Sequence, residues 1–238
     1  MKTKRFLGSA WLVLAISCGG LAVSPTARAQ PATNAPAVTN RFESEIVAFE
    51  RGDRTNPPPK NAILFTGSSS IRFWKNVPQE FFPAAAFARG FGGSQMSDLL
   101  FYVDRIVIPY APKQVFVYEG DNDLAAGKTP EEILAGYQQF VERVHHELPR
   151  TRIAFIAVKP SQARWKNLEK IKATNALIED YSKTDPRLEF IDVFSPMLDT
   201  NGSMRQELLG PDGLHMNPEG YKLWGQVIRP HVMRPRMD

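Results

Sequence analysis

Five short apolar runs, separated by stretches of helical periodicity, constrain the fold of this 238-residue chain more than any other feature. Most of the runs are apolar on both faces, which is typical of parallel strands that helices cover on each side. The runs lie at residues 62–65, 84–87, 114–118, 152–158 and 188–193. The alternation of strand and helix predicts a single-domain, three-layer α/β/α sandwich whose five-stranded parallel sheet has the common order 2-1-3-4-5.

The helix predicted over residues 129–148 has the most complete signals. Thr129 and Glu132 form a capping box, Pro130 stands at the first helical position, and the apolar residues that follow fall on one stripe. Further helices are predicted over residues 41–51, 97–109, 162–183 and 218–228. Asn217 is the predicted N-cap of the last of these helices.

The first 29 residues have the layout of a bacterial-type export signal. A basic start is followed by an apolar stretch over residues 6–23 and by a small-x-small cleavage site at Ala27–Ala29. The alternatives are a buried N-terminal helix and a lipoprotein modified at Cys18, whose surroundings loosely resemble a lipidation site. We expect residues 1–29 to be a secretory signal peptide, 30–40 a flexible leader and 41–238 the folded domain of a periplasmic or secreted protein.

The basic excess of the chain belongs to that predicted signal. The chain has 29 Lys and Arg against 25 Asp and Glu, and four of the basic residues lie within residues 1–29, which hold no acidic residue. The remainder is therefore formally neutral, and its charge does not favour nucleic-acid binding. The single cysteine, Cys18, also lies in the signal, so the rest of the chain has no thiol nucleophile and no cysteine ligand for a metal. We expect no integral membrane segment after cleavage.

The predicted topology marks two loops for chemistry, because ligands bind beyond the carboxyl ends of the strands that flank the switch point of such a sheet. The loop after the first strand is Thr66–Ser70, followed by a short helix at residues 71–74. A serine there would sit at a helix N-terminus, where unpaired N–H groups favour the negative charge that nucleophilic attack creates. The alternatives are a plain turn with an N-cap and the phosphate-binding loop of a flavodoxin-like protein.

The loop after the third strand is Glu119–Asp123. Its Asn122 could direct an amide N–H into the cleft and stabilise an oxyanion, although an Asx turn explains the same residues. The glycine-rich loop at residues 89–94 permits close approach of the backbone to a substrate, or is a tight turn.

The segment Pro211–Pro218 carries the most specific signal. A serine hydroxyl becomes a strong nucleophile only when a base takes its proton, and histidine needs an acceptor that fixes its tautomer. Asp212 and His215 are three residues apart, so one turn can bring the carboxylate to the imidazole. The other histidines are expected to be solvated surface residues and show no metal-binding spacing; they are His145, His146 and His231.

Taken together, these blocks resemble the SGNH hydrolases, also called the GDSL-like lipase/acylhydrolase family. The resemblance covers residues 60–228, with four blocks in the family's order: Gly67-Ser68-Ser69, Gly93, Gly120-Asp121-Asn122-Asp123 and Asp212-Gly213-Leu214-His215. It implies that Ser69 is the nucleophile, His215 the base and Asp212 the residue that orients it. It also implies an oxyanion hole formed by the N–H groups of Ser69 and Gly93 and the side chain of Asn122, with no metal and no cofactor.

One block departs from the family pattern. The family's Gly-Asp-Ser reads Gly67-Ser68-Ser69 here, which is similar to a branch with Gly-Ser-Ser-Ser-Ile-Arg at this point. The change removes a charge beside the nucleophile and leaves Ser68 and Ser70 as alternative nucleophiles.

The function that the resemblance implies is hydrolysis of a small-molecule ester through an acyl-enzyme. A carbohydrate O-acetylesterase, a lysophospholipase and a thioesterase would use the same mechanism. Two other classes compete with it: a non-catalytic α/β binding domain and a flavodoxin-like phosphate or flavin binder, which would leave Asp212 and His215 without a role. Near the site, Phe73, Trp74 and Phe91 are expected either to pack in the core or to line an acyl pocket.

Overall fold

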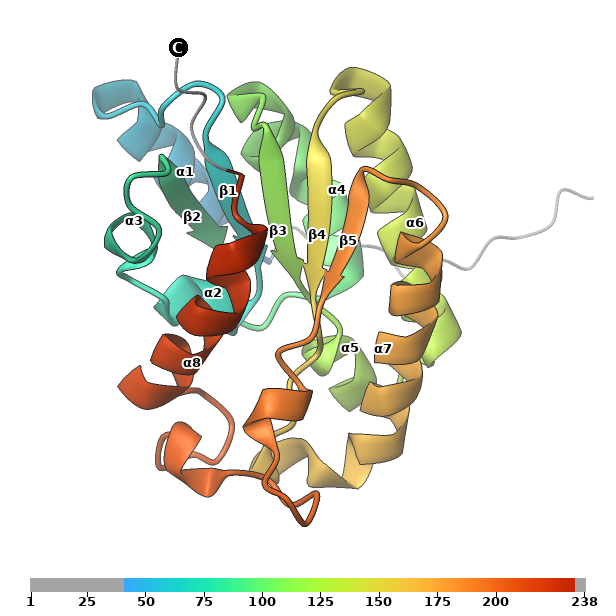
Figure 1. The fold of residues 1–238 in the computed structure, drawn as a ribbon. Helices are drawn as coiled ribbons and strands as arrows, with labels where there is room; N and C mark the ends of the chain where they lie inside the picture. The colour runs from blue at the N-terminus through green and yellow to red at the C-terminus, as the bar shows by residue number, and fades with distance from the viewer. Residues whose placement is uncertain (1–40, 234–238) are drawn as a thin grey trace, which may run out of the picture. The chain divides into compact units, whose positions relative to one another are not determined.

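A parallel sheet of five strands runs through the part of the chain that the computed structural model describes, residues 41–233 (Figure 1). The strands are β1 (Ile63–Gly67), β2 (Ala86–Gly90), β3 (Gln114–Tyr118), β4 (Arg152–Ile156) and β5 (Leu188–Ile191). Their order is β2-β1-β3-β4-β5, which confirms the predicted fold class and topology. The predicted export signal (1–29) and leader (30–40) lie outside the described residues.

Helices cover both faces of this sheet (Figure 1). On one face lie α1 (Glu43–Thr55), α4 (Met96–Ile106), α6 (Pro130–Glu147) and α7 (Leu168–Ser182), and on the other α2 (Ser69–Phe73), α3 (Val77–Glu80) and α8 (Pro218–Ile228). The short α5 (Asp121–Ala125) follows β3. The described residues also contain five 3₁₀ turns: Ile108–Tyr110, Gln162–Asn167, Ser195–Met197, Gln206–Leu208 and Arg229–His231. Within residues 41–233 no helix is both long and apolar enough to cross a bilayer.

The differences from the predicted boundaries have local causes. The helix expected to reach residue 109 ends at Ile106, because Pro109 has no N–H to continue the ladder and falls in a 3₁₀ turn. The helix expected from residue 162 begins at Leu168, after a 3₁₀ turn over Gln162–Asn167. The capping box of α6 forms as predicted, with Thr129 and Glu132 each accepting from the other's backbone N–H.

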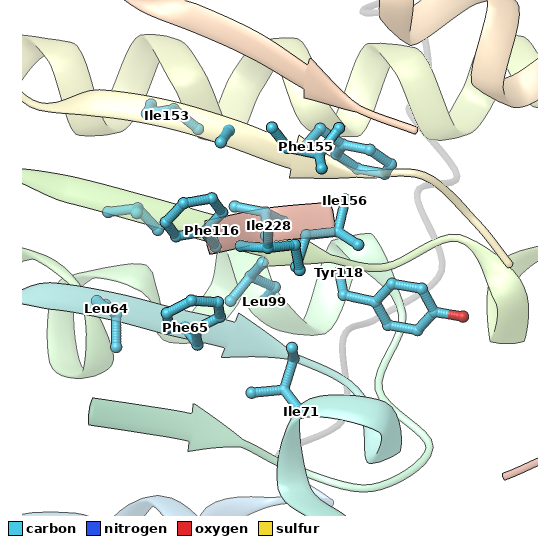
Figure 2. Close-up of a cluster of buried hydrophobic side chains, with 14 of the residues drawn as sticks. Leu64, Phe65, Ile71, Leu99, Phe116, Tyr118, Ile153, Phe155, Ile156 and Ile228 are labelled. Carbon is cyan, nitrogen blue, oxygen red and sulfur yellow. The ribbon is translucent and has the colours of Figure 1, made fainter. Parts of the chain in front are cut away.

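Aromatic and aliphatic side chains from the central strands fill the space between sheet and helices (Figure 2). Phe65 of β1 and Phe116 of β3 are stacked, with ring centroids 4.6 Å apart. Trp74 and Phe91 are also fully buried in this core. Burial of each such ring stabilises the fold by roughly 1.5–3 kcal/mol. Of the two alternatives for Trp74 and Phe91, their burial supports packing in the core over the lining of an acyl pocket.

The central strands end level with one another, and this brings the functional loops together. In the parallel register Gly67 of β1 lies opposite both Gly90 of β2 and Tyr118 of β3. Gly67 has φ of 130°, and a Cβ at this position would stand 2.0 Å from the Tyr118 carbonyl oxygen. Only glycine therefore lets β1 pass this close to β3 and turn into the loop that carries the serines.

Candidate active site

Three adjacent serines follow β1, and their exposure distinguishes them. Ser68 and Ser70 are 2% and 3% exposed, whereas Ser69 is partly exposed at the first turn of α2. Ser68 is held in extended backbone ahead of that helix, and its carbonyl accepts from the N–H groups of Ile71 and Arg72. Ser69 is thus the serine of the three whose hydroxyl a substrate can reach.

A chain of hydrogen bonds connects Ser69 to the loop before α8. The Oγ of Ser69 lies 2.9 Å from Nε2 of His215, and Nδ1 of His215 lies 2.6 Å from Oδ2 of Asp212. A carboxylate can only accept, so the proton of the neutral imidazole sits on Nδ1, and Nε2 accepts from the Ser69 hydroxyl. The structure therefore brings together the three residues that the sequence selected, although 146 positions separate Ser69 from His215.

Asp212 is held as an anion by its own loop. Its Oδ1 accepts from the backbone N–H groups of Leu214 and His215, each at 2.9 Å, while Oδ2 accepts from the imidazole. These bonds to the charged form, led by the Leu214 N–H, lower the pKa of Asp212 to about 2. Gly213, at φ of 62°, lets the chain turn tightly enough for the carboxylate to reach its neighbours' N–H groups.

Two further side chains fix the loop that carries His215. Lys159, fully buried just after β4, donates from Nζ to the Leu214 carbonyl at 2.6 Å, and its burial lowers its pKa. Asn217 caps α8 by accepting from the N–H groups of Glu219 and Gly220. The cap was predicted from sequence, but the role of Lys159 was not, because 55 residues separate its ammonium from the carbonyl that it holds.

The glycine-rich loop after β2 passes close to Ser69. A Cβ on Gly92 would lie 3.8 Å from the Cβ of Ser69 and 3.0 Å from Nη1 of Arg72. Gly93, the next residue, is exposed and has φ of 85°. The side chain of Asn122, in α5, reaches the same loop and donates from Nδ2 to the Ser94 carbonyl at 2.9 Å.

Ser94 makes two hydrogen bonds with the segment that follows β3. Besides its carbonyl bond to Asn122, its buried hydroxyl donates to Oε1 of Glu119 at 2.6 Å. We call these two contacts the Ser94 clasp. It ties the loop of Gly93 to the loop of Asn122, so one buried and one partly buried hydrogen bond position the two predicted oxyanion donors relative to each other.

Glu119 itself is fully buried, and its second oxygen, Oε2, has no hydrogen-bond partner within the described residues. Burial, reinforced by the nearby charge of Asp123, raises the pKa of Glu119 well above its usual range. The surroundings of the carboxyl group that holds Ser94 therefore favour its protonated form. Glu119 was not among the residues predicted from sequence. Its position at the end of β3, directly before the Gly-x-Asn-Asp block, could have indicated a role near the site.

The start of the described chain supports the same loop from outside. Arg41 donates to the Gly93 carbonyl at 3.1 Å and pairs with Asp98 at 2.7 Å, and Asp98 in turn accepts from the N–H of Gln95 ahead of α4. This contact was not predictable from local pattern, because Arg41 and Asp98 are 57 residues apart.

Of the aromatic residues expected near the site, Phe73 is the one that reaches it. Its ring meets the imidazole of His215 edge-on, with centroids 4.9 Å apart, and remains 45% exposed. An exposed aromatic ring against a functional histidine is available for contact with a ligand, unlike the buried rings of Trp74 and Phe91.

The remaining histidines require one correction. His145 and His231 were expected to be solvated, but His145 lies 3.0 Å from the Thr151 carbonyl and His231 lies 2.6 Å from a carboxylate oxygen of Glu189. His146 is exposed, as expected. Across residues 41–233, no group of three His, Cys, Asp or Glu side chains is arranged to hold a metal ion.

Comparison with known proteins places this geometry in context. The sequence model of the GDSL-like lipase/acylhydrolase family matches residues 56–223, most of the chain. No curated protein matches the chain significantly in sequence.

Solved structures share the fold. A Streptococcus pneumoniae protein, provisionally described as a platelet activating factor, has a TM-score of 0.71 at 24% identity, over 80% of this chain and 92% of that one. A GDSL-like lipase of Bacteroides thetaiotaomicron has a TM-score of 0.68 at 20% identity, over 78% and 96%. An acetylxylan esterase of Geobacillus stearothermophilus has a TM-score of 0.61 at 13% identity, over 74% and 97%. At these identities the likeness shows the fold.

Proposed function

The chain belongs to the GDSL-like lipase/acylhydrolase family and is a hydrolase acting on ester bonds, and from this premise we propose that Ser69, His215 and Asp212 form its catalytic triad. The observation that carries the proposal is the continuous hydrogen-bond chain from Asp212 through His215 to Ser69, at 2.6 and 2.9 Å. The reaction is acyl transfer from the ester to Ser69 and then to water.

In the first step Ser69 Oγ attacks the ester carbonyl carbon while Nε2 of His215 takes the hydroxyl proton. The imidazole becomes a cation between two partners, and the anionic Asp212 stabilises it and holds its orientation. The pKa of Asp212, lowered to about 2, keeps that carboxylate ionised throughout the neutral range. The tetrahedral intermediate then collapses, the ester C–O bond breaks, and His215 returns the proton to the departing alcohol oxygen.

Charge on the carbonyl oxygen requires donors already in place. We assign this role to the N–H groups of Ser69 and Gly93 and to Nδ2 of Asn122. The side-chain amide nitrogen of asparagine carries two hydrogens. One of them bonds to the Ser94 carbonyl, and the second is left for the oxyanion. The Ser94 clasp sets the spacing of two of these donors, Gly93 and Asn122, before substrate arrives, so these two need not reorganise during the reaction.

In the second step water replaces the alcohol. His215 takes a proton from the water as it attacks the acyl-enzyme, and the same donors stabilise the second oxyanion. Collapse of this intermediate releases the carboxylic acid, and the proton returns from His215 to Ser69. No step requires a metal or an organic cofactor.

The preferred substrate class is a small-molecule carboxylic ester. An acetylated carbohydrate is the second candidate, supported by the fold shared with an acetylxylan esterase.

Active-site labelling tests the nucleophile directly. We expect a fluorophosphonate to add once per molecule to residues 30–238, at Ser69 by peptide mass spectrometry, and p-nitrophenyl acetate and butyrate to be hydrolysed with or without a chelator. Ser69→Ala should lose both the label and the turnover, while Ser68→Ala and Ser70→Ala, if folded by circular dichroism, should keep the label. Full activity in Ser69→Ala would overturn the assignment.

A further inference from the structure

A groove of about 650 Å³ opens between the end of α2 and the start of α8. Its apolar wall is formed by Phe73, Met216, Pro218 and Tyr221. The two helices lie side by side here (Figure 1), and the hydroxyl of Tyr221 joins them by donating to the Ser70 carbonyl at 3.0 Å. Pockets of ~300–1,000 Å³ are typical of small-molecule sites, so this groove has the capacity to take part of a substrate.

Two residues that line the groove, Phe73 and Met216, adjoin His215 of the proposed catalytic site. Phe73, which forms one wall, meets the imidazole of His215 edge-on at 4.9 Å. Met216, on another wall, directly follows His215 in the chain. Two of the three donors assigned to the oxyanion, Gly93 and Asn122, lie instead on the loops after β2 and β3, and none of the three lines the groove.

The chemistry decides which part of an ester lies on that side. In the proposed mechanism His215 Nε2 gives its proton to the departing alcohol oxygen, so this oxygen must come within hydrogen-bond distance of Nε2. The carbonyl oxygen points to the oxyanion donors at the same moment. Hence the substituent nearest to His215, and nearest to the mouth of the groove, is the alcohol part of the ester rather than the acyl part.

We propose that this groove binds the alcohol part of the substrate and that this part has an alkyl or aromatic body larger than methanol. The inference rests on the proposed triad and oxyanion hole. One residue of the apolar wall, Tyr221, is held in two places: its ring packs against Trp74, with centroids 5.6 Å apart, and its hydroxyl donates to the Ser70 carbonyl. This part of the wall is already ordered without ligand, so little ordering cost opposes binding.

Two isomeric esters test the proposal. Benzyl acetate and methyl phenylacetate contain the same atoms, but the phenyl ring is on the alcohol part of the first and on the acyl part of the second. After each kcat/KM is divided by the ester's rate of hydrolysis by hydroxide, we expect benzyl acetate to be preferred about tenfold or more. Equal values, or a preference for methyl phenylacetate, would overturn the groove assignment.

Variants then locate the preference. Phe73→Ala should reduce the benzyl acetate to methyl phenylacetate ratio toward one, and Lys222→Trp, which places a bulky ring on an exposed groove position of α8, should reduce it as well. Phe101→Ala is the matched control, since Phe101 is an exposed phenylalanine of α4 that does not line the groove; its ratio should equal that of wild type. A ratio that stays intact in both groove variants would contradict the proposal.

The outcome separates this inference from the function on which it depends. If the proposed function fails, neither isomer is hydrolysed, or Ser69→Ala hydrolyses both. If only the groove assignment fails, wild type hydrolyses esters, Ser69→Ala does not, and the isomer ratio shows no preference for the larger alcohol.

Discussion

Asp212 and Glu119 are both carboxylic acids beside the proposed site, yet their surroundings move their pKa values in opposite directions. Asp212 is half exposed and accepts from two backbone N–H groups and an imidazole, which lowers its pKa to about 2. Glu119 is fully buried near a second acidic group, and its pKa is raised well above the usual range. The surroundings of Asp212 therefore favour its charged form beside His215, and those of Glu119 favour its protonated form beside Ser94.

The raised pKa of Glu119 predicts how stability depends on pH. The native state retains a proton that the unfolded chain releases near pH ~4.3, so this stabilising contribution is lost as the pH rises from there toward the native pKa. Glu119→Gln can still accept from Ser94 but has no proton to lose. We expect its free energy of unfolding to rise relative to wild type by up to ~1.4 kcal/mol per pH unit within that window.

Urea unfolding between pH 4 and pH 8 measures this difference. Glu131→Gln is the control, since Glu131 is an exposed glutamate of α6, and its stability should run parallel to that of wild type. If the free energies of unfolding of Glu119→Gln and wild type change with pH in parallel, the pKa of Glu119 is the same in the native and the unfolded state, and the prediction is wrong.

The amide of Asn122 gives a second prediction at this scale. Asn122→Ala removes one proposed oxyanion donor, which should lower kcat about 10²-fold or more while KM and the thermal midpoint change little. Steady-state kinetics and a melting curve on the same preparation test this. Unchanged kcat would remove Asn122 from the oxyanion hole, and a collapse of the melting temperature would assign it a structural role through Ser94.

At the scale of elements, the start of α8 combines two roles that are separate elsewhere in the molecule. Asn217 caps the helix and also donates to the carbonyls of Glu207 and Leu209, only two residues after His215. Thr129 caps α6 through an equivalent pair of contacts with Glu132. The cap at Asn217 belongs to the loop that positions the imidazole of His215. The cap at Thr129 begins α6, which packs on α4 and α7.

Removing either cap should lower stability, but only one removal should also lower activity. We expect Thr129→Ala to lower the free energy of unfolding by about 1 kcal/mol, and Asn217→Ala to lower it by more, because that variant also loses the two hydrogen bonds to the Glu207 and Leu209 carbonyls. Only Asn217→Ala should also lower kcat, since the loop loses its fixed register with the helix. Denaturant unfolding and kinetics on both variants provide the comparison; an equal loss of kcat in the two would contradict it.

At the scale of the whole molecule, the sheet edge at the carboxyl ends of β1, β2 and β3 gathers loops from the entire domain. The proposed nucleophile Ser69 follows β1, the glycine-rich loop follows β2 and Asn122 follows β3, while His215 lies in the segment before α8. Arg41 adds support from the start of α1. A parallel sheet places all its carboxyl strand ends on one edge, so residues remote in sequence share a site.

We also propose that the chain is exported and cleaved after Ala29, on the pattern of residues 1–29. Expressed in a bacterium with a general secretion system, the protein should be recovered outside the cytoplasm with an intact mass that begins at Gln30. A product that begins with a lipid-modified Cys18 would contradict cleavage after Ala29 and support the lipoprotein alternative. An uncleaved cytoplasmic product would contradict export.

The sequence alone was sufficient for the fold class, the strand order and most helix starts, and its resemblance to a known family singled out Ser69, Asn122, Asp212 and His215, whose roles stay predictions. These depend on local signals, since apolar runs, caps and short motifs are read within a few residues of one another. Boundaries shifted where a local breaker outweighed periodicity, as at Pro109. The helix α5 was expected to be a loop, because its five residues are too few to establish a period.

Tertiary structure decided what no local pattern contains. It buried Ser68 and Ser70 on either side of the partly exposed Ser69, and it separated Phe73 at the proposed site from Trp74 and Phe91 in the core. It also produced the long-range supports: the Ser94 clasp, the bond from Lys159 to Leu214 and the contact of Arg41 with Gly93. The physical reason is that burial and the pairing of polar groups depend on which distant segments the sheet brings together, and the energies that fix these contacts exist only once the chain has packed.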